Sequence, residues 1–328
     1  MTYTLSKIGC ALLCAWGALS AGTAFAQDYP NRNISLVMPY AAGGPGDIVA
    51  RIFAGHLQKT LGQTVVVDNT SGASGSIGSA KVARAKPDGY TLLMIHVSHA
   101  TNPVLLKNLS YNPVTDFEPI GSATEGPMVL VARKDFPAKD LQEFVAYVKA
   151  NASKLSIGQA GVGSASHLCA LMFMNALGVS LTEVPYKGSA PALNDVMGSQ
   201  LDMVCDQTST TLPAIQGGKV KAYAAAGKSR LASMPDVPAL GEAGVKGFDI
   251  SISFGIYAPK GTPPAVVDKL VGALQAALRD PDIKARLEGM GVAAVAPERG
   301  RPEALRAHLK NEMDSLGPLL IKSGVQAN

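Results

Sequence analysis

Short apolar segments rich in β-branched residues alternate with helical patterns along this chain, and this alternation limits the fold more than any other feature of the sequence. The segments predicted as strands are 34–40, 64–68, 91–97, 128–132, 155–159, 182–186, 201–206 and 220–226. Helical patterns separate most of them, which is typical of parallel strands whose sheet is covered by helices on both faces. We therefore predict an α/β fold.

The helical segments support the same architecture. The helix predicted over 47–61 has one apolar face, formed by Ile48, Ile52, Phe53, Leu57 and Leu61. Towards the C-terminus, an extended run at 248–259 precedes a predicted helix at 265–279, and a last helix is predicted at about 302–322. Two α/β units joined by extended crossing segments fit this order.

The N-terminus has the three parts of a secretory signal peptide. Lys7 precedes an apolar run over residues 8–19, and the small residues Ala24 and Ala26 flank Phe25. This pattern predicts export with cleavage after Ala26. The apolar run is shorter than the roughly 20 residues that span a bilayer, and no later stretch is long and uncharged enough to do so. We expect a freely soluble periplasmic product.

Charge and aromatic content exclude several classes of partner. The formal net charge of the 328 residues is only +4, which is too small to indicate binding to nucleic acid. Aromatic residues make up 5% of the chain, and its single tryptophan, Trp16, lies in the predicted signal peptide. Platforms for stacking bases are therefore scarce. The expected partner is a small polar molecule.

Two cysteines, Cys169 and Cys205, lie outside the predicted signal peptide. An oxidising compartment permits them to pair, but a disulfide requires Cα atoms within about 7 Å, and sequence does not reveal that distance. Cys169 lies among apolar residues of a predicted helix, and Cys205 lies near the end of a predicted strand. We interpret both as buried free thiols, with the disulfide as the alternative.

Glycine-rich or polar loops follow several predicted strands and lead into helices. They lie at 39–47, 71–76, 161–167, 186–191 and 206–210. In open α/β sheets, ligands bind at the carboxyl ends of the strands, where such loops lie. Backbone amides and the positive end of a helix can hold a carboxylate or phosphate without a charged side chain. Loops from the two halves of the chain therefore predict one anion-binding cleft.

Asp47 and Asp206 are unexpected in such loops, because a carboxylate repels a bound anion. We expect Asp47 to cap its helix or to hold a water molecule rather than to contact the anion directly. Asp206 would fit a ligand that carries an amine or a hydroxyl, or one held through a bridging water.

The sequence lacks the common catalytic motifs. The sequence has no Gly-x-Ser-x-Gly, His-Glu-x-x-His or Walker motif, and Pro45 interrupts a dinucleotide fingerprint in the first loop. The histidines are dispersed, and His96 and His99 would face opposite sides of a continued strand, which argues against a metal site. We predict a binding protein and not an enzyme, with no catalytic residues, no cofactor and no metal.

Several stretches together resemble the solute receptors of tripartite tricarboxylate transporters, also called Bug receptors. They are PYAAGG at 39–44 with Asp47 and Arg51, LGQ at 61–63, VVVDN at 65–69, SGASG at 71–75, KPDGYTLL at 86–93, GSASHL at 163–168, VPYKG at 184–188, MPDVP at 234–238 and YAPKGTP at 257–263. The resemblance covers almost the whole chain after the signal peptide.

The resemblance implies a periplasmic binding protein fold of the type II-like Venus flytrap kind. Its two α/β domains would be joined by two crossing strands near 123–131 and 246–256. We expect a first domain built from 27–126 and 250–328 and a second domain from 127–249. The first loop would hold a carboxylate, often through ordered waters, and loops of the second domain would select the rest of the ligand.

The resemblance, together with the loops, gives a set of expected ligand-binding residues. In the first domain they are Tyr40, Ala41, Ala42, Gly43, Gly46, Asp47, Ser74, His96 and His99. In the second domain they are Ser164, Ala165, Ser166, His167, Tyr186, Asp206, Gln207 and Thr208. The family more often has a small turn rich in Gly, Ser and Thr at 95–99, so His96 or His99 is expected to tune the choice of ligand.

The implied ligand is a small carboxylate: a dicarboxylate, a tricarboxylate, an aromatic acid or an amino acid. The implied partners are the membrane components of a tripartite tricarboxylate-type transporter, and we expect the receptor to be a monomer. Two alternatives remain. The same trap could dock to a periplasmic sensor kinase, or, less in keeping with the motifs, the chain could be a periplasmic hydrolase.

Overall fold

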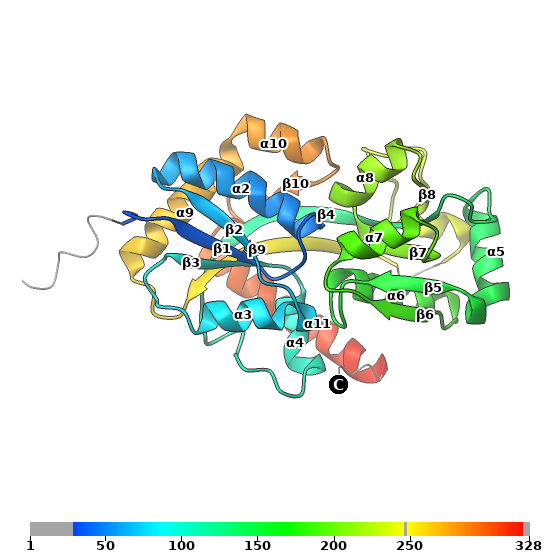
Figure 1. Ribbon diagram of the computed structural model, residues 1–328, viewed down its shortest axis with the longest axis horizontal. Helices are drawn as coiled ribbons and strands as arrows, with labels where there is room; N and C mark the ends of the chain where they lie inside the picture. The colour runs from blue at the N-terminus through cyan, green and yellow to red at the C-terminus, as the bar shows by residue number, and fades with distance from the viewer. Residues whose placement is uncertain (1–28, 246–247, 324–328) are drawn as a thin grey trace, which may run out of the picture.

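The computed structural model describes residues 29–245 and 248–323, and the predicted signal peptide with its cleavage after Ala26 lies outside them. The described chain forms two α/β lobes that lie side by side, with the start and the end of the sequence in one lobe and the middle in the other (Figure 1). None of its helices is long and apolar enough to cross a membrane.

The first lobe is built around three parallel strands, with β1 between β2 and β3. Its strands are β1 (Ile34–Met38), β2 (Val65–Asn69), β3 (Thr91–Ile95) and the two-residue β10 (Ala293–Ala294). Its helices are α2 (Pro45–Leu61), the single turn η1 (Ala73–Gly75), α3 (Ser76–Ala83), α4 (Ser98–Leu105), α9 (Pro264–Arg279), α10 (Pro281–Glu288) and α11 (Pro302–Ser323).

The second lobe repeats the pattern, with β5 parallel to both β6 and β7. Its strands are β5 (Ser156–Gln159), β6 (Thr182–Pro185), β7 (Met203–Gln207) and β8 (Val220–Ala225). Its helices are α5 (Leu141–Asn151), η2 (Ala152–Lys154), α6 (Ala165–Leu177), α7 (Ser189–Met197), α8 (Thr208–Gln216) and η3 (Leu240–Ala243). Both lobes confirm the predicted α/β class.

Two long strands, β4 (Phe117–Arg133) and β9 (Ser251–Pro259), run between the lobes and pair with each other. The sheet order is β2-β1-β3-β9-β4-β7-β5-β6, and β8 and β10 also pair with β4. β9 is antiparallel to β3, and β4 is antiparallel to β7. Each lobe therefore keeps its predicted parallel strands, and the two crossing strands add antiparallel pairs because they run in opposite directions and join both parallel sets.

The strand predicted at 128–132 is only the end of β4. Pro119, Gly121 and Pro127 disfavour a strand in a pattern reading, since proline cannot donate to a ladder and glycine weakens it. The structure accommodates them because the register of β4 against β9 shifts between Pro119 and Gly121 and again between Ser122 and Thr124. Such irregularities bend a strand without ending it.

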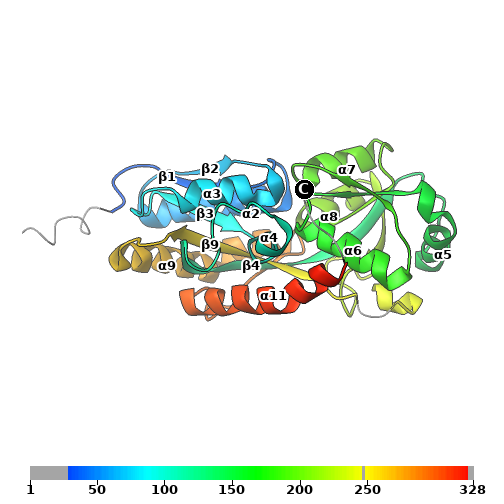
Figure 2. The same cartoon turned by 90° about the horizontal axis from the view of Figure 1, so that it is seen from below.

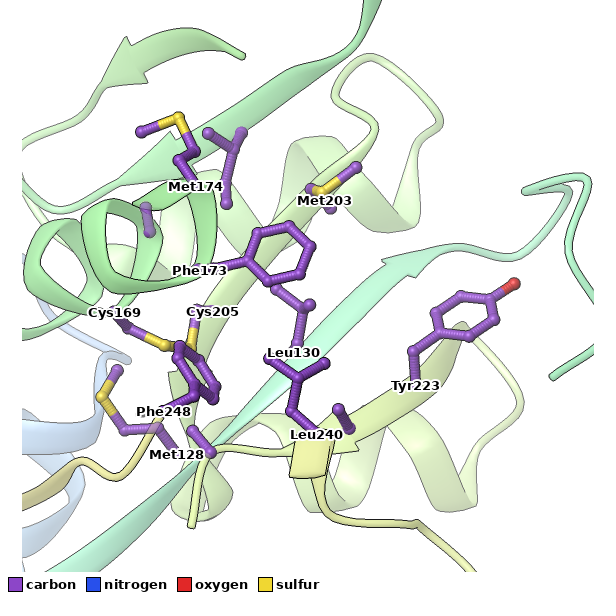
Figure 3. Close-up of a cluster of buried hydrophobic side chains, with 14 of the residues drawn as sticks. Met128, Leu130, Cys169, Phe173, Met174, Met203, Cys205, Tyr223, Leu240 and Phe248 are labelled. Carbon is purple, nitrogen blue, oxygen red and sulfur yellow. A yellow bond between two sulfur atoms is a disulfide. The ribbon is translucent and has the colours of Figure 1, made fainter. Parts of the chain in front are cut away.

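Each lobe has its own hydrophobic core. In the first lobe, the predicted apolar face of α2 is confirmed: Ile52, Phe53 and Leu57 are buried, with Ile48 and Leu61 packed at the edge. In the second lobe, Phe173 of α6 lies against the strands in the cluster drawn in Figure 3. Full burial of one such side chain contributes about 1.5–3 kcal/mol.

Cys169 of α6 and Cys205 of β7 form a disulfide, with their Cα atoms 6.0 Å apart (Figure 3). The interpretation of two buried free thiols was therefore wrong. Helix α6 packs on β7, and this contact brings two cysteines 36 positions apart in sequence within bonding reach. The bond lies inside the core of the second lobe.

Helix α11 spans both lobes. Leu305 and Leu309 are buried in the first lobe, and Leu320 belongs to the core of the second. Figure 2 shows this helix running below the first lobe towards α6. The lobes are thus linked by β4, by the segment leading into β9, and by this helix.

Candidate functional site

Two adjoining cavities lie between the lobes and share Tyr40 and Ala160 in their walls. The outer cavity has a volume of about 600 Å³ and the inner one about 30 Å³. The inner cavity is lined by Tyr40, Gly44, Pro45, Gly46, His96, Ala160, Ala165, Ser166, Ser189, Asp206, Gln207 and Phe254. Residues from both lobes therefore face one another across a small enclosed space.

Four helices begin at the inner cavity. The lining includes Gly44, Pro45 and Gly46 at the start of α2, Ala165 and Ser166 at the start of α6, Ser189 at the start of α7, and Gln207 directly before α8. The first amide groups of a helix have no partner inside the helix, and the helix dipole places positive charge there. Four such ends around one space make a strong anion site, and no lysine or arginine is among the inner lining residues.

The first loop takes its shape from Asp47. Its carboxylate accepts hydrogen bonds from the Gly43 amide and the Arg51 Nε, both at 2.9 Å. Burial alone would raise the pKa of Asp47, but these bonds outweigh it, so the pKa lies below its ordinary value. Gly43 has a φ of 79°, a conformation that favours glycine. Asp47 therefore holds the loop in place and is absent from the lining of both cavities.

Gly46 lies where the first turn of α2 passes closest to the strands. A Cβ atom at this position would lie 2.6 Å from Met38 Sδ and 3.0 Å from Phe254 Cε1. The absence of a side chain therefore lets the helix start approach the cavity wall. Ala41 and Ala42 are not in the lining, and the Ala41 amide instead donates to the Lys187 carbonyl of the second lobe at 3.2 Å.

One wall of the inner cavity is aromatic. The rings of Tyr40 and His96 are 4.8 Å apart, and Phe254 lies beyond His96. His96 Nδ1 accepts a hydrogen bond from the Ser98 amide at 3.2 Å, so the proton of the neutral ring is on Nε2. Burial lowers the pKa of His96 to about 3. His96 is therefore a neutral hydrogen-bond donor in the wall.

His99 lies elsewhere. It is buried among Tyr111, Phe117 and Tyr257, with ring centroids 4.7 to 5.9 Å from its own, and it lines neither cavity. The strand ends at Ile95 rather than at the predicted residue 97, and α4 begins at Ser98. This turn sends the two histidines to different places, so the structure does not bring His99 to the site.

In the second lobe, the start of α6 is organised by its own side chains. Ser164 caps the helix by accepting from the His167 amide, and the Ser166 Oγ accepts from the Ala160 amide at 2.7 Å. His167 Nδ1 accepts from the Gly163 amide at 2.8 Å, and its Nε2 lies 3.0 Å from Glu183 Oε2. Ala165 and Ser166 therefore face the cavity, whereas Ser164 and His167 hold the loop behind them.

Asp206 and Gln207 end β7 and form the opposite wall. Asp206 Oδ2 accepts from the Thr210 hydroxyl at 2.7 Å. Burial raises the pKa of Asp206 to about 6, even though Thr210, the Gln207 amide and Ser189 favour its ionised form. The Gln207 Nε2 is buried and has no hydrogen-bond acceptor among the described residues. A buried donor without an acceptor is costly, so its place in the wall points to a ligand acceptor.

The outer cavity adds Ser74 from the first lobe and Tyr186 and Lys187 from the second. The Tyr186 hydroxyl donates to Asp195 Oδ2 at 2.5 Å, which fixes its ring. Thr208 is not in the lining; its Oγ1 donates to the Gly291 carbonyl of the first lobe at 2.9 Å. A second bond between the lobes runs from Thr101 Oγ1 to the Gly163 carbonyl at 2.8 Å.

The fold and this cleft agree with what is known of related proteins. The family model described as tripartite tricarboxylate transporter family receptor matches residues 49–322. The chain belongs to this receptor family. The family resemblance expected from the sequence and the periplasmic binding protein fold are thereby confirmed.

Individual relatives and solved structures are similar to this receptor over most of its length. The Bordetella pertussis protein BugT is 30% identical over 328 residues, covering 99% of both chains. The periplasmic binding protein BugD is 49% identical, with a TM-score of 0.89 over 92% of this chain and 100% of its own. MatC from Rhodopseudomonas palustris, solved with malate, is 39% identical, with a TM-score of 0.85 over 89% of this chain and 100% of its own.

Several lining residues of this receptor were not among those expected from sequence. Ser189, Ala160, Phe254 and Lys187 all line one of the cavities. Ser189 and Lys187 could have been included, because the loop at 186–191 was recognised as leading into a helix. Ala160 and Phe254 carry no such signal, since an alanine after a strand and a phenylalanine within one are usual core residues.

Proposed function

We propose that this receptor captures a small aliphatic di- or tricarboxylate in the periplasm and delivers it to the membrane components of a tripartite tricarboxylate-type transporter. The observation that carries the proposal is the meeting of four helix starts and the buried Gln207 donor at one interlobe cavity without a lysine or arginine in the inner wall. Such a wall suits a compact anion that is held by backbone amides.

The energetics are sufficient. A hydrogen bond to a charged group contributes roughly 1.5–3 kcal/mol, and micromolar affinity corresponds to about 8 kcal/mol. About four well-placed donors meet that requirement. The amide groups at the starts of α2 and α6, the Gln207 side chain and the His96 Nε2 are our candidates.

Two relatives favour aliphatic acids among the ligands left open by the sequence. MatC is described with bound malate, and the R. palustris protein Rpa4515, which is 30% identical, is described with adipate. Both ligands are open-chain dicarboxylates. The outer cavity, of about 600 Å³, has room for such a chain beyond the anion-binding inner part.

We also infer the domain limits, the export step and the closure motion. The residues of the first domain would be 27–126 and 250–328, and those of the second 127–249, with cleavage after Ala26. Each domain would contribute one wall of the cleft, and the ligand would favour an arrangement in which hydrogen bonds such as those of Thr101 and Thr208 bridge the lobes. The receptor would act as a monomer and would not convert its ligand.

A thermal-shift screen of the purified receptor against dicarboxylates, tricarboxylates, acidic amino acids and aromatic acids tests this function, because a ligand that binds only the folded state stabilises it. We expect an open-chain dicarboxylate or tricarboxylate to raise Tm, and to be recovered unchanged after long incubation. No shift with any acid, or chemical conversion of the ligand, would overturn the proposal.

The partner needs a separate test, since a receptor for a sensor kinase could have the same cleft. Deletion of the receptor gene should abolish uptake of the ligand found in the screen while leaving ligand-dependent transcription unchanged. The opposite result would favour the sensory role.

A further inference from the structure

Asp206 is the one carboxylate in the lining of the inner cavity. The residue is 3% exposed, and no lysine, arginine or histidine whose side chain the structure describes forms an ion pair with it. Its protein partners are neutral donors: the Thr210 hydroxyl, the Gln207 amide and the Ser189 hydroxyl. A buried carboxylate without a cation is costly, and such groups are usually paired.

The remainder of the inner wall consists of donors. The helix starts present amide groups, Gln207 presents its Nε2, and His96 presents its Nε2 proton. These groups suit the oxygen atoms of a ligand carboxylate. Asp206 does not, because an ionised carboxylate can only accept hydrogen bonds and repels a second anion.

A ligand that pairs with both the hydrogen-bond donors of the inner wall and the Asp206 carboxylate must carry a carboxylate and, close to it, a group that donates hydrogen bonds. The inner cavity is small, with a volume of about 30 Å³, and this favours a ligand in which these two groups are near neighbours. Resting on the proposed function, we propose that Asp206 makes this receptor selective for carboxylates that bear a hydroxyl or ammonium group on the carbon next to a carboxylate, over the unsubstituted acids of the same length.

The proposed selectivity arises because an unsubstituted acid has no hydrogen-bond donor to offer to Asp206. An unsubstituted acid leaves Asp206 facing a bare methylene and a carboxylate, so the receptor must either protonate Asp206 or bear the repulsion. Thr210, Gln207 and Ser189 donate to Asp206, but a carboxylate has about four acceptor positions. An analogue without a donor leaves the last position and the buried charge uncompensated, and a site built to hydrogen-bond a ligand donor rejects such an analogue. A hydroxyl and an ammonium group share this chemistry, and the ammonium also supplies the missing positive charge.

Matched sets of acids test the proposal by titration calorimetry at pH 8. The sets are succinate, malate and aspartate; glutarate, 2-hydroxyglutarate and glutamate; and tricarballylate and citrate. Within the set that fits the cavity, we expect the substituted acid to bind roughly tenfold to hundredfold more tightly than the plain one. A larger preference for the ammonium member than for the hydroxyl member would identify the amino acid as the source of the donor.

The variant Asp206→Asn should remove most of this discrimination by weakening the substituted acid and strengthening the plain one. Asp135→Asn, at an exposed acid of the same lobe that pairs with Arg133, is the matched control and should leave the ratio unchanged. Equal affinity for plain and substituted acids in the wild type, or an unchanged ratio in Asp206→Asn, would overturn the inference while leaving the proposed function standing. Binding of no member of any set would overturn both.

Discussion

The two lobes each place an aspartate where a strand leads into a helix, and they treat it in opposite ways. Asp47 of the first lobe has Arg51 four residues later, and the pair shares hydrogen bonds at 2.9 Å. Asp206 of the second lobe has Thr210 four residues later, which offers a hydroxyl and no charge. An aspartate followed four residues later by its partner thus forms an ion pair that holds a loop in the first lobe. In the second lobe it remains a carboxylate with only neutral hydrogen-bond donors around it.

The largest predicted effect concerns the second lobe alone. Replacing both Cys169 and Cys205 by alanine should lower the free energy of unfolding by about 4 kcal/mol, as expected for a loop of 36 residues. Hydrogen exchange should show the loss of protection in α6 and β7, with α2 and β1 little changed. Ligand affinity should fall as well, because Ser166 and Asp206 lie beside the two cysteines. An equal loss of protection in both lobes would contradict the prediction that the disulfide stabilises the second lobe alone.

Asp206→Asn should stabilise the unliganded protein. The pKa of Asp206 is raised to about 6, so its ionised form is disfavoured by folding, and at pH 8 the penalty is about 3 kcal/mol. At Asp206 the folded state binds more protons than the unfolded state between pH 4 and 6, so the contribution of Asp206 to stability falls as pH rises through this window. The lowered pKa values of His96 and His99 act in the opposite direction, but equally in wild type and variant. The other ionisable groups of the inner wall, Tyr40 and His96, stay neutral there. The variant should therefore have a higher Tm than the wild type at pH 8 but not at pH 4. A lower Tm of the variant at pH 8 would contradict the prediction that burial disfavours the ionised Asp206.

Asp47→Asn should act in the opposite direction. It removes the charge that Arg51 and the Gly43 amide stabilise, at a cost of about 1–2 kcal/mol, reduced by the exposure of Arg51. The pKa of Asp47 is lowered in the folded state, so the contribution is present above about pH 4 and is lost as pH falls below it. Urea unfolding at pH 7 and pH 3 measures the difference, and Arg51→Met should reproduce most of it. A variant more stable than the wild type would show that the Asp47 carboxylate does not stabilise the loop.

The smallest predicted effect concerns the contact between the lobes. Thr101→Val removes the hydrogen bond to the Gly163 carbonyl, worth about 1 kcal/mol, and should weaken ligand affinity about fivefold through the closed state. The unfolding of each lobe should change little. Thr262→Val, whose hydroxyl bonds to the Pro259 carbonyl within the first lobe, is the control and should leave the affinity unchanged. Equal affinity in wild type and Thr101→Val would remove this bond from the closing interaction.

Sequence alone predicted the α/β class, most strand and helix positions and the segments that form the cleft. These features depend on local patterns: apolar periodicity and glycine-rich loops. It did not predict the length of β4, because Pro119 and Pro127 are tolerated only through pairing with β9. The disulfide also depends on packing between distant segments, which no local pattern encodes.

The roles of the site residues also divide into those that a local sequence pattern predicts and those that depend on the folded chain. Of the residues predicted to bind ligand, Gly46, Ser166 and Gln207 line the cavity, whereas Asp47, Ser164 and His167 support the lining from behind. A sequence shows which residues a loop contains. Which of them face inward depends on hydrogen bonds such as that from the Gly163 amide to His167, and these bonds exist only in the folded chain.

The continuity of β4 has a mechanical consequence. The strand exchanges β9 for β7 as its partner between Pro127 and Met128, so both sheets share one unbroken backbone. This shared strand opposes sliding of the lobes past each other and favours rotation about that point. A ligand that draws the two walls of the cleft together would therefore change the outer surface of the receptor mainly through the angle between the lobes.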